Sequence, residues 1–197
     1  MHSSNLTGRA GVAGGVAAGA LLVAGSASAA VCQGLTGVVS GGKIHYTVMG
    51  KLNSPFGSLP AGAPITAKLI YNPAQTSSPA PNPKGNYRSF KIKVRSGSQQ
   101  TSDSGLGTID IYDKPSFYPT DMFHAYNTTP VTGTLGGLNL ASGAGLQISL
   151  QNLPGTGWSS VALPGAGLTM ANLTAGNGTF IELRSTTGVS ARANLCP

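Results

Sequence analysis

The sequence predicts an all-β protein, a single antiparallel β-sandwich of the jelly-roll or immunoglobulin-like kind that follows a signal peptide. Apolar and polar residues alternate with a period of two in many short segments. Gly, Pro, Asn and Ser cluster between these segments, as they do in turns. Helical spacing of apolar residues is sustained nowhere. Short strands without intervening helices are typical of a sandwich rather than of a βαβ fold.

Residues 1–29 are predicted to be a secretory signal peptide. Arg9 supplies a positive charge ahead of an apolar run over residues 12–24, and small residues with an A-x-A cleavage pattern end at Ala29. A membrane span is the alternative, but the run is shorter than the roughly 20 strongly apolar residues that a span needs. We therefore expect a secreted domain over residues 30–197, periplasmic or extracellular, with no transmembrane segment after cleavage.

The alternating segments give the predicted strands in order. In the strand predicted over residues 87–95, Phe90, Ile92 and Val94 would face inward and the basic residues between them would face solvent. The other strands are predicted at residues 43–49, 65–71, 108–112, 146–150 and 179–183, with weaker patterns around Val38 and at residues 122–126, 168–173 and 189–194.

The longest irregular segment, residues 72–86, is rich in proline. It is predicted to be an exposed loop rather than a linker between domains, because the chain on each side would be too short to form a stable domain of its own. Residues 30–197 together suit one domain with a substantial core.

Charged residues make up only 9% of the chain, with 12 Lys or Arg against 5 Asp or Glu. An ordinary soluble domain contains about 25%. So few carboxylates exclude multi-carboxylate metal cages and much of the usual enzyme repertoire. An apolar content of 40% also argues against intrinsic disorder of the usual kind.

Residues 109–126 are the least ordinary part of the chain, because three of the five acids and five of the twelve aromatic residues gather there. Carboxylates and loop carbonyls can hold Ca²⁺, and flat aromatic faces can stack on sugar rings. Calcium is kept as an alternative cofactor, but no EF-hand spacing is present and no metal ligands are assigned. The candidate ligand-binding residues are Asp110, Tyr112, Asp113, Tyr118, Asp121, His124, Tyr126 and, farther along the chain, Trp158.

A catalytic site has little support. His45 and His124 are the only histidines of the predicted domain, and His45 alternates with apolar neighbours so that it points to solvent. A triad of a serine with His124 and Asp121 or Asp113 is compatible with the sequence, since triads assemble in space. No G-x-S-x-G, H-E-x-x-H or P-loop motif is present. The sequence therefore favours a non-enzymatic protein.

The basic excess is densest at Lys91, Lys93 and Arg95, on the outward face of one predicted strand, with Lys84 and Arg88 just before them. Such a patch can bind acidic polysaccharide, teichoic acid, lipid headgroups or extracellular DNA. The simpler interpretation is a solvated strand face whose lysines discourage edge-to-edge aggregation. The sequence favours this simpler interpretation and predicts no specific nucleic-acid partner.

Cys32 and Cys196, the only cysteines, stand near opposite ends of the predicted domain. In an oxidising compartment such a pair is predicted to form a disulfide that joins the termini. A lipid anchor at Cys32 is the alternative, but Val31 stands where a lipoprotein signal needs a small residue.

Three motifs carry a family resemblance. Residues 46–50 read YTVMG, residues 62–73 read GAPITAKLIYNP, and residues 146–150 read LQISL, with a Leu-Pro turn at residues 163–164. In this order of hairpin, strand and turn, the chain resembles secreted bacterial proteins of unknown function, best known among those with a PEP-CTERM sorting tail. The resemblance implies an exported β-sandwich of the envelope or matrix and no catalytic residues. No Pro-Glu-Pro motif or Arg-rich tail is present, so it implies no sorting or anchoring by that route.

The favoured hypothesis is a secreted, non-enzymatic β-sandwich with a binding or structural role at the cell surface or in the extracellular matrix. Its partners would be polysaccharide, other surface proteins or further copies of the chain. Two alternatives remain open. One is a carbohydrate-binding module with Tyr112, Tyr118, Tyr126 or Trp158 as stacking platforms, and the other is a small secreted hydrolase centred on His124.

Overall fold

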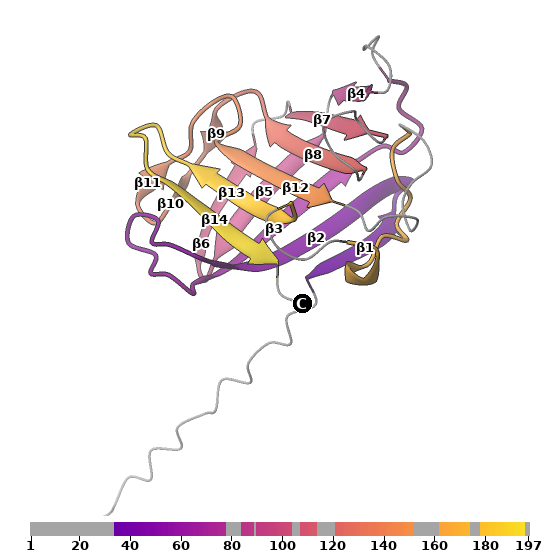
Figure 1. Cartoon of the computed structure of the whole chain (residues 1–197). Helices are drawn as coiled ribbons and strands as arrows, with labels where there is room; N and C mark the ends of the chain where they lie inside the picture. Colours follow the sequence, from indigo (N-terminus) through magenta and orange to yellow (C-terminus); the bar gives the residue numbers. More distant parts are fainter. Residues whose placement is uncertain are drawn as a thin grey trace, which may run out of the picture. The chain divides into compact units, whose positions relative to one another are not determined.

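The structure, a computed structural model, confirms the all-β prediction (Figure 1). The described residues form one domain of antiparallel strands, and among them the only helix is a 3₁₀ turn, η1, at Met170–Asn172. None of the described segments is a helix that could cross a bilayer. The structure describes residues 34–77, 84–88, 90–103, 107–113, 121–151, 162–173 and 178–195.

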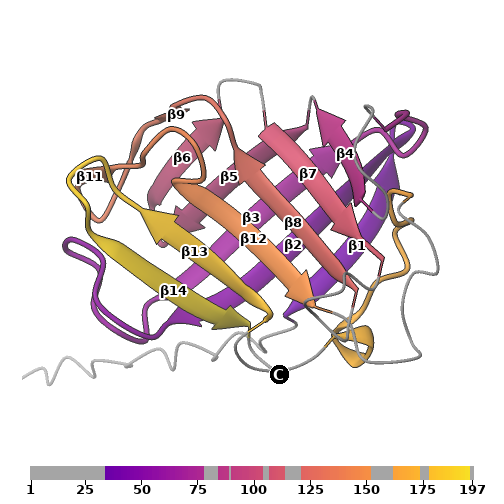
Figure 2. The same ribbon diagram turned by 45° about the horizontal axis from the view of Figure 1, so that its top comes forward.

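Twelve of the described strands form one continuous sheet that folds over on itself into two layers (Figure 2). Layer 1 has the order β2-β3-β5-β6-β9, with β1 on the other side of β2, and layer 2 has the order β4-β7-β8-β12-β13-β14. The strands of layer 1 are β1 (Leu35–Ser40), β2 (Lys43–Leu52), β3 (Pro64–Tyr71), β5 (Lys91–Ser96), β6 (Gln99–Asp103) and β9 (Val131–Thr132). The strands of layer 2 are β4 (Lys84–Arg88), β7 (Gly107–Tyr112), β8 (Met122–Asn127), β12 (Leu146–Gln151), β13 (Phe180–Arg184) and β14 (Ser190–Leu195). A separate small hairpin pairs β10 (Thr134–Leu135) with β11 (Leu138–Asn139).

The two layers are joined where β14 meets β2. One edge of β2 pairs with β3 over residues 44–51. The other edge pairs first with β1, over residues 43–48, and then with β14, over residues 50–52. The backbones approach closely at Gly50, since a Cβ built there would lie 2.4 Å from the carbonyl oxygen of Asn194. A residue without a side chain is therefore needed where the sheet passes from one layer to the other.

The core lies between the layers, as the alternation of strand side chains requires. Each large apolar side chain that is fully buried contributes about 1.5–3 kcal/mol. The rings of Tyr46 and Tyr71 stack with centroids 6.2 Å apart, and the Tyr71 hydroxyl donates to the Pro164 carbonyl at 2.6 Å. The Tyr46 hydroxyl donates to the Gly165 carbonyl, so both tyrosines hold the segment around Pro164 against layer 1. Other large core side chains are Phe56, Phe90, Phe123, Ile65, Leu69, Ile92, Ile109 and Ile111.

Two strand predictions were wrong. The strand predicted over residues 87–95 is two strands in different layers, because β4 ends at Arg88 and β5 begins at Lys91. The weak strand predicted at residues 168–173 contains the 3₁₀ turn instead. Leu168 and Met170 are partly buried there and pack against the core, so their apolar character reflects a covering segment rather than a sheet.

Cys32, Cys196 and residues 1–29 lie outside the described residues, and no disulfide is present in the part that is described. The described neighbours of the cysteines nevertheless meet in the fold. The Gly34 carbonyl accepts a hydrogen bond of 2.7 Å from Met49, and Leu195 pairs with the next residue of β2. The disulfide remains a prediction, and the convergence of these two segments supports it.

Candidate functional site

Layer 2 places three chemically notable side chains in one row on its outer face. The register sets Asp110 on β7 opposite His124 on β8, and His124 opposite Ser149 on β12. The apolar residues that alternate with them, such as Ile109 and Ile148, lie in the core. Sheet register therefore brings together residues that are up to 39 positions apart in the sequence.

Asp110 is the centre of a polar network within the protein. Its carboxylate accepts hydrogen bonds from Asn86 Nδ2 at 2.6 Å and from the Tyr126 hydroxyl at 3.1 Å. Lys84 Nζ lies 3.0 Å from the same carboxylate and 5.2 Å from the centre of the Tyr112 ring. Burial alone would lower the pKa of Lys84, but its interactions with Asp110 and Tyr112 outweigh burial and raise it. The Asp110 carboxylate is thus already occupied by groups of the protein itself.

His124 lies beside this network, and its buried Nε2 has no hydrogen-bond partner among the described residues. Its ring and the Tyr112 ring form a T-shaped pair, with centroids 6.0 Å apart and an angle of 70° between the ring planes. Burial lowers the pKa of His124, and the nearby Asp110 carboxylate only partly opposes this effect. His124 is therefore neutral at neutral pH.

The row of Asp110, His124 and Ser149 has the residue types of a catalytic triad but different contacts. In a triad the serine hydroxyl donates to the histidine, and the histidine donates to the acid. Here the Ser149 hydroxyl donates to the Gly178 carbonyl at 2.8 Å, while Asp110 binds Lys84. These contacts hold the row as part of a sheet surface rather than as a proton relay.

A hollow of about 360 Å³ opens beside this row and is named the layer 2 hollow. Its lining includes Glu182, only 5% exposed, whose carboxylate binds Arg184 Nε at 2.7 Å and Arg192 Nε at 3.2 Å. The Arg192 guanidinium lies 4.2 Å from the centre of the Phe180 ring. The residues that line it include His124, Gln147, Ser149, Gln151, Phe180, Glu182, Arg184 and Arg192.

The layer 2 hollow has the size and chemistry of a small polar binding site. Ligand pockets usually measure about 300–1,000 Å³. The two arginines use Nε for Glu182, and both side chains line the hollow and are about half exposed. Gln147, which lies opposite Glu182 in the sheet, adds a neutral amide. Amides, guanidinium groups and a carboxylate are the groups that recognise hydroxyl-rich ligands.

The structure brings together only part of the predicted site. Asp110, Tyr112, His124 and Tyr126 lie side by side on β7 and β8. Of the remaining candidates, Asp113 follows the end of β7, Asp121 is buried just before β8, and Tyr118 and Trp158 lie outside the described residues.

Glu182, Arg184 and Arg192 were missed as site residues. The sequence carried a signal for them, because Glu182 lies in the strand predicted at residues 179–183, Arg184 stands two positions after it, and Arg192 falls in the next predicted strand. Oppositely charged residues on the same face of neighbouring strands are candidates for a cross-strand pair.

The predicted basic cluster is divided between the layers. Lys91, Lys93 and Arg95 project outward from β5 in layer 1. Lys84 and Arg88 belong to β4 in layer 2, where Lys84 binds Asp110. The five basic residues therefore do not form one patch.

Within the described residues, no three histidine, cysteine or acidic side chains come together as they would around a metal ion. No protein-family model matches the chain, and neither the search of curated proteins nor that of solved structures found a match.

Proposed function

We propose that the chain is an exported, non-enzymatic binding protein of the cell surface or extracellular matrix, and that it binds polysaccharide. The observation that carries this proposal is the layer 2 hollow, built around Glu182, Arg184 and Arg192. Export is supported by the predicted signal peptide and the predicted disulfide, and by the resemblance to secreted proteins with PEP-CTERM tails.

Carbohydrate fits this hollow better than an apolar ligand. Each sugar hydroxyl both donates and accepts hydrogen bonds, and the lining offers the amides of Gln147 and Gln151, two guanidinium groups and a carboxylate. The cation-π contact holds Arg192 over Phe180, which fixes one guanidinium in the free protein. A lining that is fixed before the ligand arrives loses less conformational entropy on binding.

A glycan array with residues 30–197 tests this proposal. Gln147→Ala and Arg192→Ala should each weaken binding to the retained glycans by about tenfold or more, which corresponds to about 1.4 kcal/mol. Arg88→Gln, which removes an exposed charge from β4 and does not touch the lining of the hollow, is the matched control and should bind normally. Absence of any glycan ligand, or binding that both hollow variants leave unchanged, would contradict the proposal.

A hydrolase is the second candidate, because Asp110, His124 and Ser149 occupy one row. Turnover of simple aryl ester or aryl glycoside substrates that is abolished by Ser149→Ala would replace the binding proposal. We expect no such turnover, since the Ser149 hydroxyl already donates to Gly178 and Asp110 already binds Lys84.

A further inference from the structure

The two outer faces of the sandwich differ in charge. β1, β2, β3 and β5 of layer 1 contain no acidic residue. Every ion pair found among the described residues involves Asp110 or Glu182, both of layer 2. Alternation turns Lys68 of β3 outward, beside Lys93 and Arg95 of β5. The outer face of layer 1 is therefore cationic and has no acid on these four strands to neutralise it.

Two lysines of this face are directly opposed. Lys68 on β3 lies opposite Lys93 on β5. Two residues away on each strand, Thr66 lies opposite Arg95. Directly opposite residues have Cβ atoms about 4.5–5.5 Å apart, and like charges in such positions destabilise a sheet. The free protein therefore contains an unfavourable interaction between the Lys68 and Lys93 side chains. An anion bound between the two lysines would remove it.

Protection of a sheet edge does not explain these lysines. Edge strands use lysine to prevent pairing with another chain. However, β3 lies between β2 and β5, and β5 lies between β3 and β6, so both strands are interior. Their backbone edges are already paired on both sides, so protection against edge-to-edge aggregation, which was one part of the interpretation favoured for Lys91, Lys93 and Arg95, does not apply here.

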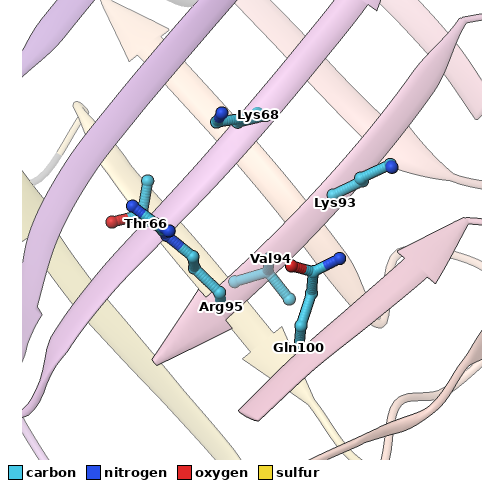
Figure 3. A pocket seen from close by; sticks show the side chains of 6 residues that line it. All are labelled: Thr66, Lys68, Lys93, Val94, Arg95 and Gln100. Atoms are coloured by element: carbon cyan, nitrogen blue, oxygen red, sulfur yellow. The ribbon is translucent and has the colours of Figure 1, made fainter. Parts of the chain in front are cut away.

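A second hollow lies among these cations (Figure 3). This layer 1 hollow measures about 140 Å³ and is lined by Thr66, Lys68, Lys93, Val94, Arg95 and Gln100. Arg95 extends from β5 across to Thr66 on β3. Such a volume admits a carboxylate or sulfate group with a few waters, since each water occupies about 30 Å³. Thr66 and Gln100 add neutral hydrogen-bonding groups for adjacent hydroxyls.

We propose that the outer face of layer 1 binds an acidic polysaccharide, with one anionic group in the layer 1 hollow. Alternate outward residues of a strand lie about 7 Å apart. Lys91, Lys93 and Arg95 therefore repeat a positive charge along β5, which suits a polymer with regularly spaced anionic groups rather than a single ion. This site is separate from the layer 2 hollow and does not depend on it.

The face lacks what a single-stranded nucleic acid would need. Proteins that bind such strands stack the bases on aromatic side chains. The outward residues of β2, β3 and β5 include no Phe, Tyr or Trp, and His45 is their only ring apart from Pro64. Sugar hydroxyls require no stacking platform when amide, hydroxyl and cationic groups are available.

The test is the affinity of residues 30–197 for polygalacturonate, with neutral dextran as the negative control. Binding should weaken as the salt concentration rises from about 50 to 200 mM. This is the dependence expected when Lys and Arg side chains displace the counterions of a bound polyanion. The double variant Lys68→Gln/Lys93→Gln should bind at least about tenfold more weakly at low salt, with a smaller salt dependence. Arg88→Gln, which removes an exposed charge from layer 2, should change the affinity less than Lys93→Gln, the matched single variant.

Several outcomes would overturn the proposal. Equal effects of Arg88→Gln and Lys93→Gln would mean that only net charge matters. Tighter binding to single-stranded DNA or to phosphatidylserine vesicles at the same salt would assign the face to another class of partner. The melting temperature gives a second measurement, because relief of the Lys68–Lys93 repulsion should leave the double variant at least as stable as the wild type; a decrease would remove the premise. Glycan binding at the layer 2 hollow should be unaffected, so the two proposals can fail separately.

Discussion

Replacement of Asp110 by Asn should destabilise the protein markedly. The Asp110 side chain is 6% exposed and is bound by Lys84, Asn86 and Tyr126. Hydrogen bonds to a charged group contribute about 1.5–3 kcal/mol each but do not add fully. The Asn side chain can still accept one of them, and Lys84, 28% exposed, can turn toward water. We therefore expect Asp110→Asn to lower the free energy of unfolding by about 2–3 kcal/mol.

The assay is thermal and urea unfolding at neutral pH. For a domain of this size, each kcal/mol corresponds to about 2–4 °C, so the melting temperature should fall by about 4–12 °C. Asp113→Asn, a partly exposed acid just beyond β7, is the control and should change stability by no more than about 0.5 kcal/mol. Lys84→Gln should add little to Asp110→Asn in the double variant, because the two residues share one interaction.

The same variant also separates a structural carboxylate from a ligand-binding one. The contacts of Asp110 assign it to the protein's own network, so glycan binding should survive in the folded fraction of Asp110→Asn. An Asp110→Asn variant that has the melting temperature of the wild type but no longer binds glycan would refute this reasoning and would place the ligand at Asp110.

Three further predictions concern His124, the predicted disulfide and the junction of the layers. Burial holds the pKa of His124 below its usual value, so the unfolded chain binds the proton more readily, and the free energy of unfolding should decrease as pH falls through about 6.5. This decrease, measured by urea unfolding, should be smaller in His124→Gln than in the wild type. Cys32→Ser should lower the melting temperature in the absence of reductant, whereas free thiols titrated in the wild type would exclude the disulfide. Gly50→Ala should cost about 1–3 kcal/mol in chemical unfolding because of its 2.4 Å clash, while Gly167→Ala, which meets nothing within 4 Å, should be neutral.

The strands that the sequence predicted well are those with one apolar face. β2 and β3 alternate without interruption, so their inward residues were evident from the period alone. The division between β4 and β5 was also marked in the sequence. Tyr87 and Phe90 are both buried but stand three positions apart, which no single strand with one buried face allows. The alternation of apolar and polar residues shifts by one position between Tyr87 and Phe90, and this shift marked the boundary between the two strands.

β6 could not be predicted from its own residues. Gln99–Asp103 contains no apolar residue, and it becomes a strand because β5 and β9 pair with it on either side. The local cue is the turn before it, where Gly97 takes a positive φ of 57°. Pairing with neighbours, rather than residue preference, determines such a strand.

The candidate site, like β6, could be predicted only in part from residues that are close together along the chain. The acids from Asp110 to Asp121 are close along the chain and were predicted to share one site. The sheet instead gathers residues by register, so Glu182 lies between Gln147 on β12 and Arg192 on β14. Proximity along the chain identified the network around Asp110, whereas the layer 2 hollow required the order of the strands.

The separation of charge between the layers leads to a prediction about salt. In layer 2, Asp110 and Glu182 form ion pairs with three neighbouring cations and offset two of the three positive charges, so ligand binding there should depend mainly on hydrogen bonds. In layer 1 the outward lysines have no acid on β1, β2, β3 or β5, so binding there should depend on counterion release. An increase in salt from about 50 to 200 mM should therefore weaken polygalacturonate binding strongly and neutral glycan binding little. Equal salt dependence of the two ligands would mean that they share one surface, because the core between the layers keeps the two outer faces apart.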